Sequence, residues 1–369
     1  MGGGAPRRRG RRRVAEGHRE APRAERVGGR TYDGWVSDSA GADPVQPPSS
    51  APVASARTGR GIVYALAAYL IWGFLPIYFI ALAPTGPFEI VAWRVLFSLV
   101  FCAVAIVVTR AWRPFAVILK RPRIVLIMAA AGVLIYVNWQ TYVYATTSGE
   151  VVEASLGYFI NPIVTVLLGV VVLRERLRLT QWIAIGISVV AVVVLTVGYG
   201  TLPWIALALA FSFGLYGLVK KQVGRDVDAL SGLTLETAWL APVAIVQLIV
   251  VGATTALTIG HGSVLHTIGL VGAGVITAVP LLFFAAASRR LPLIVMGFIQ
   301  YFTPILQLVV GVGLLHEAMP LERWIGFGLV WVALVVLTVD MVLAVRRERR
   351  AGAVRADATD AVPSDPLPE

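Results

Sequence analysis

Residues 162–175 read PIVTVLLGVVVLRE, and residues 304–317 read PILQLVVGVGLLHE. Sliding the sequence on itself by 142 positions places Pro162 on Pro304 and Glu175 on Glu317. Apolar runs share a small alphabet, so matches at Leu and Val arise by chance. Paired Pro and Glu at one constant offset do not, and we interpret the two stretches as copies of one element.

The similarity extends in both directions from this pair. Trp182 falls on Trp324 at the same offset, and Ala65-Leu66-Ala67 falls on Ala206-Leu207-Ala208 at an offset of 141. The sequence therefore predicts two related halves, residues 59–199 and residues 200–345.

The composition indicates a membrane protein. Hydrophobic residues make up 57% of the 369 residues and charged residues only 14%, whereas soluble domains carry about 25% charged residues. Continuous rather than alternating apolar runs of about 20 residues indicate membrane helices. The sequence predicts an all-α polytopic protein with ten transmembrane helices, near residues 61–82, 89–109, 124–145, 150–173, 180–198, 202–219, 230–252, 264–288, 291–315 and 322–345.

The charges are confined to the tails and to short gaps between the apolar runs. Residues 1–58 are polar and Arg-rich, and this composition predicts a disordered basic tail; residues 346–369 form a second charged tail. Of the 32 Lys and Arg residues, 12 lie in the first 60 positions, so the net charge of +11 does not indicate a nucleic-acid partner.

The basic gaps also predict the topology. Lys and Arg occupy alternate gaps, which places both termini in the cytoplasm by the positive-inside rule. Five helices is an odd number, so the second half must enter the membrane upside down. Such an inverted repeat is the geometry of alternating access in many transporters.

Polar residues deep in a membrane are costly and therefore mark candidate sites. Arg94 lies in the second predicted helix, where a buried arginine would need a partner such as Glu89, Glu150 or Glu153. It could instead reach the outer interface as a structural charge. Both interpretations stay open at this point.

Further candidates for substrate binding are Asn138 and Trp139 in the third predicted helix, Glu153, Tyr158 and Asn161 in the fourth, and Gln300 and Tyr301 in the ninth. Because proline removes a helical hydrogen bond, Pro162 and Pro304 predict helix breaks or gating points at matching places in the two halves. Hydrogen bonding between helices is the competing explanation for the amides.

Glu236, in the seventh predicted helix, is a candidate for proton or ion coupling or a plain charge near a helix end. The lone cysteine, Cys102, excludes a disulfide, and no histidine lies in the middle of a span. No phosphate-binding GxxxxGK[ST] motif occurs. We therefore expect no cofactor, metal or nucleotide, and a small-molecule substrate in a lipid bilayer; the oligomeric state stays open.

The chain resembles the EamA branch of the drug/metabolite transporter superfamily, and within it the RarD-type chloramphenicol-sensitivity permeases. The resemblance covers about residues 60–345 and rests on Ala67-Ala-Tyr-Leu-Ile-Trp-Gly73, Asn138-Trp139, Glu153-Ala-Ser-Leu-Gly-Tyr-Phe-Ile-Asn-Pro162, Ala208-Leu-Ala-Phe-Ser-Phe-Gly-Leu-Tyr-Gly217, Glu236-Thr237 and Gln300-Tyr301. It implies a permease of the bacterial inner membrane. The chain departs from the family pattern at Arg174-Glu175, where Gly-Glu is common, and at Trp93, where His is common.

A secondary transporter of a small metabolite or drug fits these features best. A membrane-embedded enzyme would need clustered acids or histidines, and a channel would need a polar stripe or filter. An enzyme and a non-transporting scaffold are the alternatives.

Overall fold

The computed structural model of the protein describes residues 51–173, 177–223, 226–288, 290–291, 295–296 and 299–360. These residues form helices joined by turns, and none of them lies in a strand. Most of the predicted N-terminal tail, the end of the C-terminal tail and Glu175 of the repeat lie outside the described residues.

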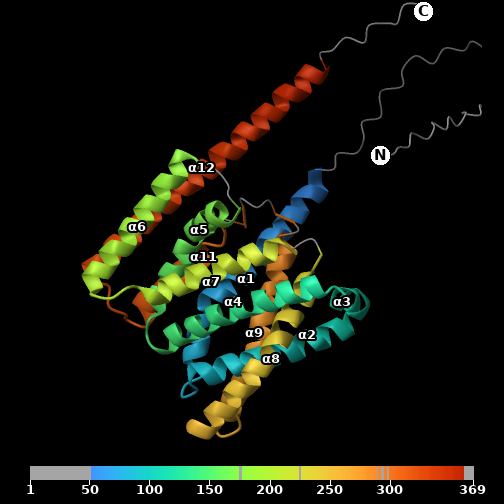
Figure 1. Ribbon diagram of the computed structural model, residues 1–369, viewed down its shortest axis with the longest axis vertical. Helices are drawn as coiled ribbons and strands as arrows, with labels where there is room; N and C mark the ends of the chain where they lie inside the picture. The colour runs from blue at the N-terminus through green and yellow to red at the C-terminus, as the bar shows by residue number, and fades with distance from the viewer. Residues whose placement is uncertain are drawn as a thin grey trace, which may run out of the picture. The chain divides into compact units, whose positions relative to one another are not determined.

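Eight of the described helices are long and apolar enough to cross a membrane. They are α1 (Ala51–Ile80), α2 (Pro87–Val108), α4 (Pro122–Thr147), α5 (Val151–Leu173), α6 (Leu179–Tyr199), α8 (Ala229–Thr254), α9 (Val264–Ser288) and α12 (Leu321–Asp360), as Figure 1 shows.

Two shorter apolar helices coincide with the sixth and ninth predicted spans. One is α7 (Trp204–Lys221), and the other is α11 (Phe302–Val309), which a π-helical turn at Val310–Leu314 continues. The all-helical membrane fold is confirmed, and the full count of ten spans stays a prediction.

Three local features differ from the sequence-based expectations. Helix α3 (Trp112–Leu119) lies in the basic gap that was expected to be a plain loop, and its Ile118 is buried beside Met128 of α4. Helix α1 begins at Ala51 rather than near residue 61, and α12 continues to Asp360, well past residue 345. The residues beyond 345 are mostly Arg, Ala and Glu, which favour helix even where no apolar core supports them.

The predicted break at Pro162 is wrong for the backbone, because α5 runs without interruption from Val151 to Leu173. One missing N–H costs a single hydrogen bond, and a helix packed on several sides can tolerate that loss. Pro304 lies in the first turn of α11, where a proline has no intrahelical hydrogen bond to lose.

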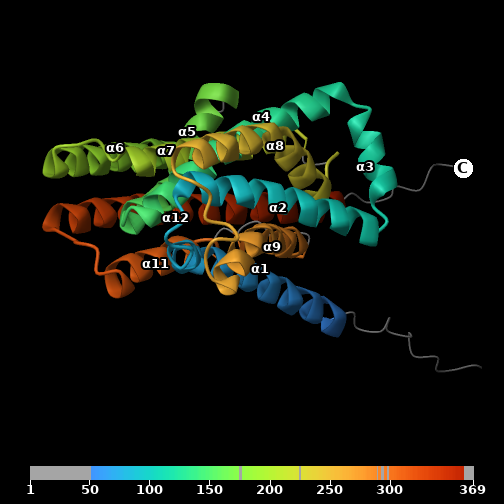
Figure 2. The same cartoon turned by 90° about the horizontal axis from the view of Figure 1, so that it is seen from below.

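The helices pack in pairs that join distant parts of the chain. Helix α6 lies alongside α12, α2 packs on α8 and α9, and α7 packs on α4 and α5, as Figure 2 shows. Helix α1 packs on α9 and α11. Buried apolar side chains form one cluster mainly among α1, α2, α4, α8 and α9, with Ala154 of α5 and Ile205 and Leu209 of α7. A second cluster lies among α5, α6, α7, α11 and α12.

The connections fall at two ends of this bundle, which we name by the charges found there. The acidic end holds the segments 81–86, 148–150, 200–203, 255–263 and 315–320, with Glu89, Glu150, Glu153 and Glu317 in or beside them. The basic end holds the segments 109–121 and 222–228 and the beginning of α6, with Arg110, Lys120, Arg121, Arg178 and Lys220.

Candidate functional site

Arg94 lies well inside the bundle. It is the eighth residue of α2, so about 10 Å of helix separates it from Pro87 at the acidic end. Its side chain is only 4% exposed, so it does not extend to the interface.

Neutral groups surround the Arg94 guanidinium. Its Nε donates to Oγ1 of Thr277 at 2.8 Å, and its Cζ lies 4.2 Å from the Trp139 ring centre and 5.5 Å from that of Phe79. Tyr78, Tyr142 and Tyr158 are close enough to interact with it electrostatically. Among the described residues, no carboxylate lies within ion-pair distance of Arg94.

These contacts offset only part of the cost of burying the charge. Removing an ion from water costs several kcal/mol even after the protein relaxes. A desolvated cation–π contact returns about 2 kcal/mol, and a hydrogen bond from a charged donor about 1.5–3 kcal/mol. A guanidinium carries five N–H donors, and Thr277 satisfies one of them, so Arg94 has capacity left for an anionic ligand.

Asn138 and Tyr158 form a polar network next to this charge. Nδ2 of Asn138 donates to the Leu209 carbonyl at 3.2 Å and to Oγ of Ser212 at 3.1 Å. The Tyr158 hydroxyl donates to Oδ1 of Asn138 at 3.3 Å. The network joins α4, α5 and α7, so these candidates share one site.

Gln307 of α11 lies next to the polar groups around Arg94, through its contact with Tyr142. Its Nε2 donates to the Tyr142 hydroxyl at 2.9 Å and to the Trp72 carbonyl at 3.2 Å. Its Oε1 is buried, and none of the described residues hydrogen-bonds to it. Because the Trp72 carbonyl can only accept, the amide orientation is fixed and the free atom is the oxygen. We call Arg94, Asn138, Trp139, Tyr142, Tyr158, Thr277 and Gln307 the Arg94 cluster.

A groove of about 400 Å³ opens at the acidic end. Phe79, Thr85, Tyr144 and Thr147 are among its lining residues. Phe79 also lies against the Arg94 guanidinium. Phe79 therefore borders both the groove and the Arg94 cluster.

Glu153 has contacts of a different kind. Its Oε1 accepts from the backbone N–H groups of Ile205 and Ala206 at 2.9 and 3.3 Å, at the beginning of α7. Gly157, one turn further along α5, lies so close to Ala206 that a Cβ would meet its carbonyl oxygen at 2.7 Å. Glu153, Gly157 and Asn161 share one face of α5, and this face packs on α7.

Two further glutamates bind backbone at the acidic end. Oε1 of Glu89 accepts from the N–H groups of Thr258 and Ile259 at 2.9 and 3.3 Å. The carboxylate of Glu317 accepts from the N–H groups of Val151 and Val152 at 2.7 and 2.8 Å. Burial raises the pKa of the Glu317 carboxyl, and these two N–H groups oppose the rise. With Glu153, they form three clasps that hold segments distant in sequence.

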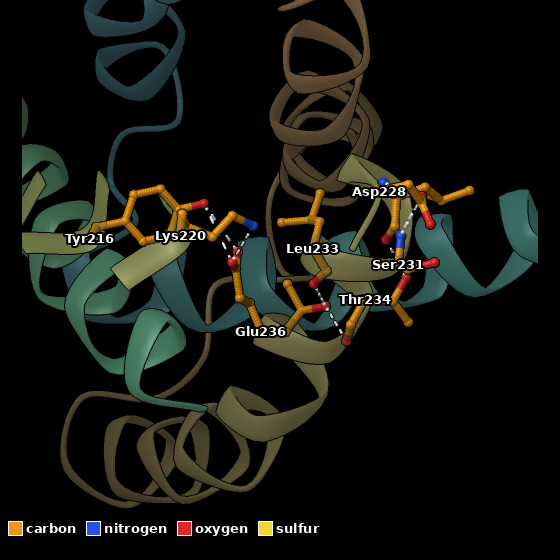
Figure 3. A network of polar contacts seen from close by, with 9 residues as sticks. Tyr216, Lys220, Asp228, Ser231, Leu233, Thr234 and Glu236 are labelled. Atoms are coloured by element: carbon orange, nitrogen blue, oxygen red, sulfur yellow. Dashed lines mark hydrogen bonds and ion pairs between the residues drawn. The ribbon is translucent and has the colours of Figure 1, made fainter. Parts of the chain in front are cut away.

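Glu236 is buried near the basic end. Its Oε1 lies 2.7 Å from Nζ of Lys220, and the Tyr216 hydroxyl lies 3.4 Å from both carboxylate oxygens. Figure 3 shows Lys220 and Tyr216 of α7 directed at Glu236 of α8. The ion pair therefore joins two neighbouring helices, and Lys220 is its partly exposed member.

Comparison with known proteins identifies the family. The model of the EamA-like transporter family matches residues 59–197. The Protein RarD of Streptomyces exfoliatus is 45% identical over 289 residues, which are 78% of this chain and 91% of that protein. The chain is a RarD-type member of the EamA-like transporter family. The Protein RarD of Escherichia coli K12 is 38% identical over 79% of this transporter and 98% of its own length.

A solved crystal structure shares the fold of this EamA-like transporter. It aligns with a TM-score of 0.50 and 18% identity, over 76% of this chain and 97% of the other. The family and the apolar helices together make the chain a multi-pass membrane transporter.

The remaining predicted residues of this RarD-type transporter lie elsewhere. The Tyr301 hydroxyl contacts Thr338 of α12, and Gln300 lies in the turn before α11, so neither has a described contact with the Arg94 cluster. Oδ1 of Asn161 is buried without a hydrogen-bond partner, close to Gly214 of α7.

Three residues of interest escaped the sequence-based interpretation. Gln307 and Thr277 are polar residues within apolar runs, which was the available signal for both. Asp340, in α12, pairs with Arg178 at 3.0 Å. Within the described ranges, no group of three or more His, Cys, Asp or Glu side chains is placed to hold a metal ion.

Proposed function

We propose that this protein is a secondary transporter that moves a small molecule by alternating access about the Arg94 cluster. The observation that carries the proposal is a buried arginine that has no carboxylate partner among the described residues, at a place where α2, α4, α5, α9 and α11 meet. Polar groups at such depth are costly, and transport pathways are their usual setting.

The helix packing supports an inverted repeat. With α1, α2, α4, α5 and α6 in the first half, their counterparts are α7, α8, α9, α11 and α12. If the halves are related, each contact between helices should have a counterpart between the matching helices of the other half. The α4–α7 contact corresponds to α9–α1, and the α5–α7 contact corresponds to α11–α1. Both counterparts are present. The Arg94 cluster draws on both halves, as a central site between repeats would.

Each end of the bundle carries contacts that could open in turn. The three glutamate clasps hold the acidic end, and the ion pairs of Lys220 with Glu236 and of Arg178 with Asp340 hold the basic end. Separating either set would expose the Arg94 cluster to one side of the membrane. At the acidic end, movement of Phe79 would connect the groove with the cluster.

Glu236 is the candidate coupling residue in this scheme. A proton taken up by its carboxylate would remove the attraction to Lys220, and Lys220 already reaches the water with 30% of its side chain exposed. Protonation would therefore loosen the α7–α8 contact at the basic end.

Flux from liposomes tests the transport function. Purified full-length protein would be reconstituted with an internal mixture of amino acids, organic acids, nucleosides and antibiotics, and mass spectrometry would follow the contents over time. We expect selective loss of one chemical class from liposomes with the wild-type protein and not from those with Arg94→Ala. Equal loss from protein-free liposomes for every solute contradicts the proposal.

A further inference from the structure

Among the described residues, Arg94 is the buried charge within the helices whose hydrogen-bonding capacity is mostly unused. Glu236 pairs with Lys220 and Asp340 pairs with Arg178, while Glu89 and Glu153 bind backbone N–H groups. In the described part of the chain, Arg94 is the buried cation, and no acidic group pairs with it. A ligand could supply the missing negative charge.

The surroundings of the guanidinium indicate the shape of that ligand. Trp139 and Phe79 lie over it, and Tyr142 contacts both Phe79 and Tyr158 edge to face. A carboxylate is planar and can accept two N–H bonds side by side from one guanidinium. The aromatic side chains beside it favour a flat apolar body.

Gln307 adds an independent requirement. Its Oε1 is buried and unpartnered, while its Nε2 is held by Tyr142 and the Trp72 carbonyl. An unsatisfied buried acceptor is costly, and a hydroxyl or amino group on the ligand would satisfy it. Tyr142 interacts with both Gln307 and Arg94, so one side chain links the two groups that the ligand would contact.

Resting on the proposed transport function, we propose that the substrate is a small organic carboxylate with an apolar or aromatic body and a hydrogen-bond donor. Arg94 binds the carboxylate, and Gln307 accepts from the donor. Trp139, Tyr142 and Tyr158 pack on the apolar body. An inorganic anion shares only the charge, so it would satisfy Arg94 and leave Gln307 unpaired.

Three probes separate these contributions. Phenyllactate has the charge and the hydroxyl, phenylpropionate has the charge alone, and phenyllactamide has the hydroxyl alone. Binding to the full-length protein in nanodiscs would be measured by calorimetry and by fluorescence, since Trp139 lies at the site. We expect phenyllactate to bind about tenfold or more tightly than either relative, a difference that one lost charge-assisted contact readily produces.

The variants assign the two contacts. Arg94→Gln should abolish the preference for phenyllactate over phenyllactamide, and Gln307→Met should abolish the preference for phenyllactate over phenylpropionate. Thr277→Val keeps the charge and removes the Nε partner, so it should weaken binding without changing the order of the probes. Arg121→Gln is the matched control, because this arginine is half-exposed at the basic end, and it should bind like wild type.

Each outcome has a definite meaning. Equal binding of phenyllactate and phenyllactamide by wild type, no binding of any probe, or unchanged charge preference in Arg94→Gln overturns the assignment. Chloride that competes fully with phenyllactate, with no effect of Gln307→Met, indicates an inorganic anion and also overturns it. Selective flux of neutral solutes would support the transport function and contradict the carboxylate substrate. Carboxylate binding at Arg94 without flux would support the ligand class and contradict the transport function.

Discussion

At the residue scale, the ion pair between Glu236 and Lys220 is the charge contact with the largest expected effect on stability. Glu236 is nearly inaccessible to water, whereas Lys220 keeps part of its side chain exposed. Removing one member of a buried pair leaves the other charge without compensation, which costs more than the pair itself contributes.

The first prediction follows from this asymmetry. Lys220→Met should lower the free energy of unfolding by about 2–4 kcal/mol, because it leaves the Glu236 carboxylate buried alone. Adding Glu236→Gln should recover more than half of the loss. Denaturation in mixed micelles, with the single and double variants compared in a cycle, measures both effects.

An exposed pair supplies the control for that cycle. Arg121 and Asp226 are 3.2 Å apart and both half-exposed, so Arg121→Gln should cost at most about 1 kcal/mol. A Lys220→Met variant no less stable than Arg121→Gln would contradict the importance given to burial.

A second prediction concerns Glu89, whose Oε1 accepts from two backbone N–H groups and from Nε1 of Trp93. Glu89→Gln keeps the shape but replaces a charged acceptor by a neutral one, and we expect a loss of about 1–2 kcal/mol. Thermal unfolding of the purified variant measures it. Asp226→Asn, at an exposed site, is the comparison, and an equal effect of the two substitutions would count against the clasp.

The sequence supported only part of the candidate site at this scale. Arg94, Asn138, Trp139 and Tyr158 could be proposed because polar or amphipathic side chains in apolar runs are costly, and the structure brings them together. The hydrogen-bond partners of these residues could not be predicted. Thr277 meets Arg94, and the Leu209 carbonyl meets Asn138, only because the helices pack together. Glu89, Glu150 and Glu153 were the natural partners for Arg94 in sequence, but backbone N–H groups or Arg323 bind them instead.

At the element scale, close helix contacts depend on glycines facing a neighbouring backbone. Gly157 of α5 lies against Ala206 of α7, whereas a Cβ on Gly186 of α6 would meet nothing within 4 Å. The two positions therefore separate the effect of packing from that of helix propensity.

The third prediction compares these glycines. Gly157→Ala should destabilise the protein by about 1–3 kcal/mol, because α7 must move away from α5. Gly186→Ala should be neutral or stabilising by up to about 1 kcal/mol, since alanine favours the helix. Unfolding midpoints of the two variants in one detergent provide the measurement, and equal midpoints would argue against the tight α5–α7 contact.

Helix positions were predictable where an apolar run was long enough to exclude other structures. The ends of α2, α5 and α9 differ from the predicted spans by two residues or fewer. Helix α3 was missed because its apolar side is short and lies within a basic gap. The continuation of α12 was missed because the spans were predicted from apolar runs, and the residues after 345 are polar even though they are helical.

At the scale of the whole molecule, the distribution of charge predicts orientation. By the positive-inside rule, the basic gaps predict that the basic end faces the cytoplasm. Connections at the acidic end carry glutamates that bind backbone, and a basic side chain is rare there.

Thiol labelling on intact cells tests this orientation and is the fourth prediction. In a Cys102→Ala background, Ser148→Cys should react with a membrane-impermeant maleimide from outside, since Ser148 is exposed at the acidic end. Lys120→Cys, exposed at the basic end, should react only after permeabilisation. The opposite pattern would reverse the assigned topology.

The three glutamate clasps have one more consequence, for how this family varies. Glu89, Glu153 and Glu317 bind main-chain N–H groups of Thr258, Ile259, Ile205, Ala206, Val151 and Val152. Every residue except proline carries the same N–H group, so exchanges at those six positions other than to proline keep the donors. We expect deep mutational scanning to find the glutamates intolerant of every substitution, whereas the buried partners Val151, Val152, Ile205 and Ala206 should accept apolar residues of similar size. Pairwise covariation across homologues should accordingly miss contacts that join residues up to 170 positions apart.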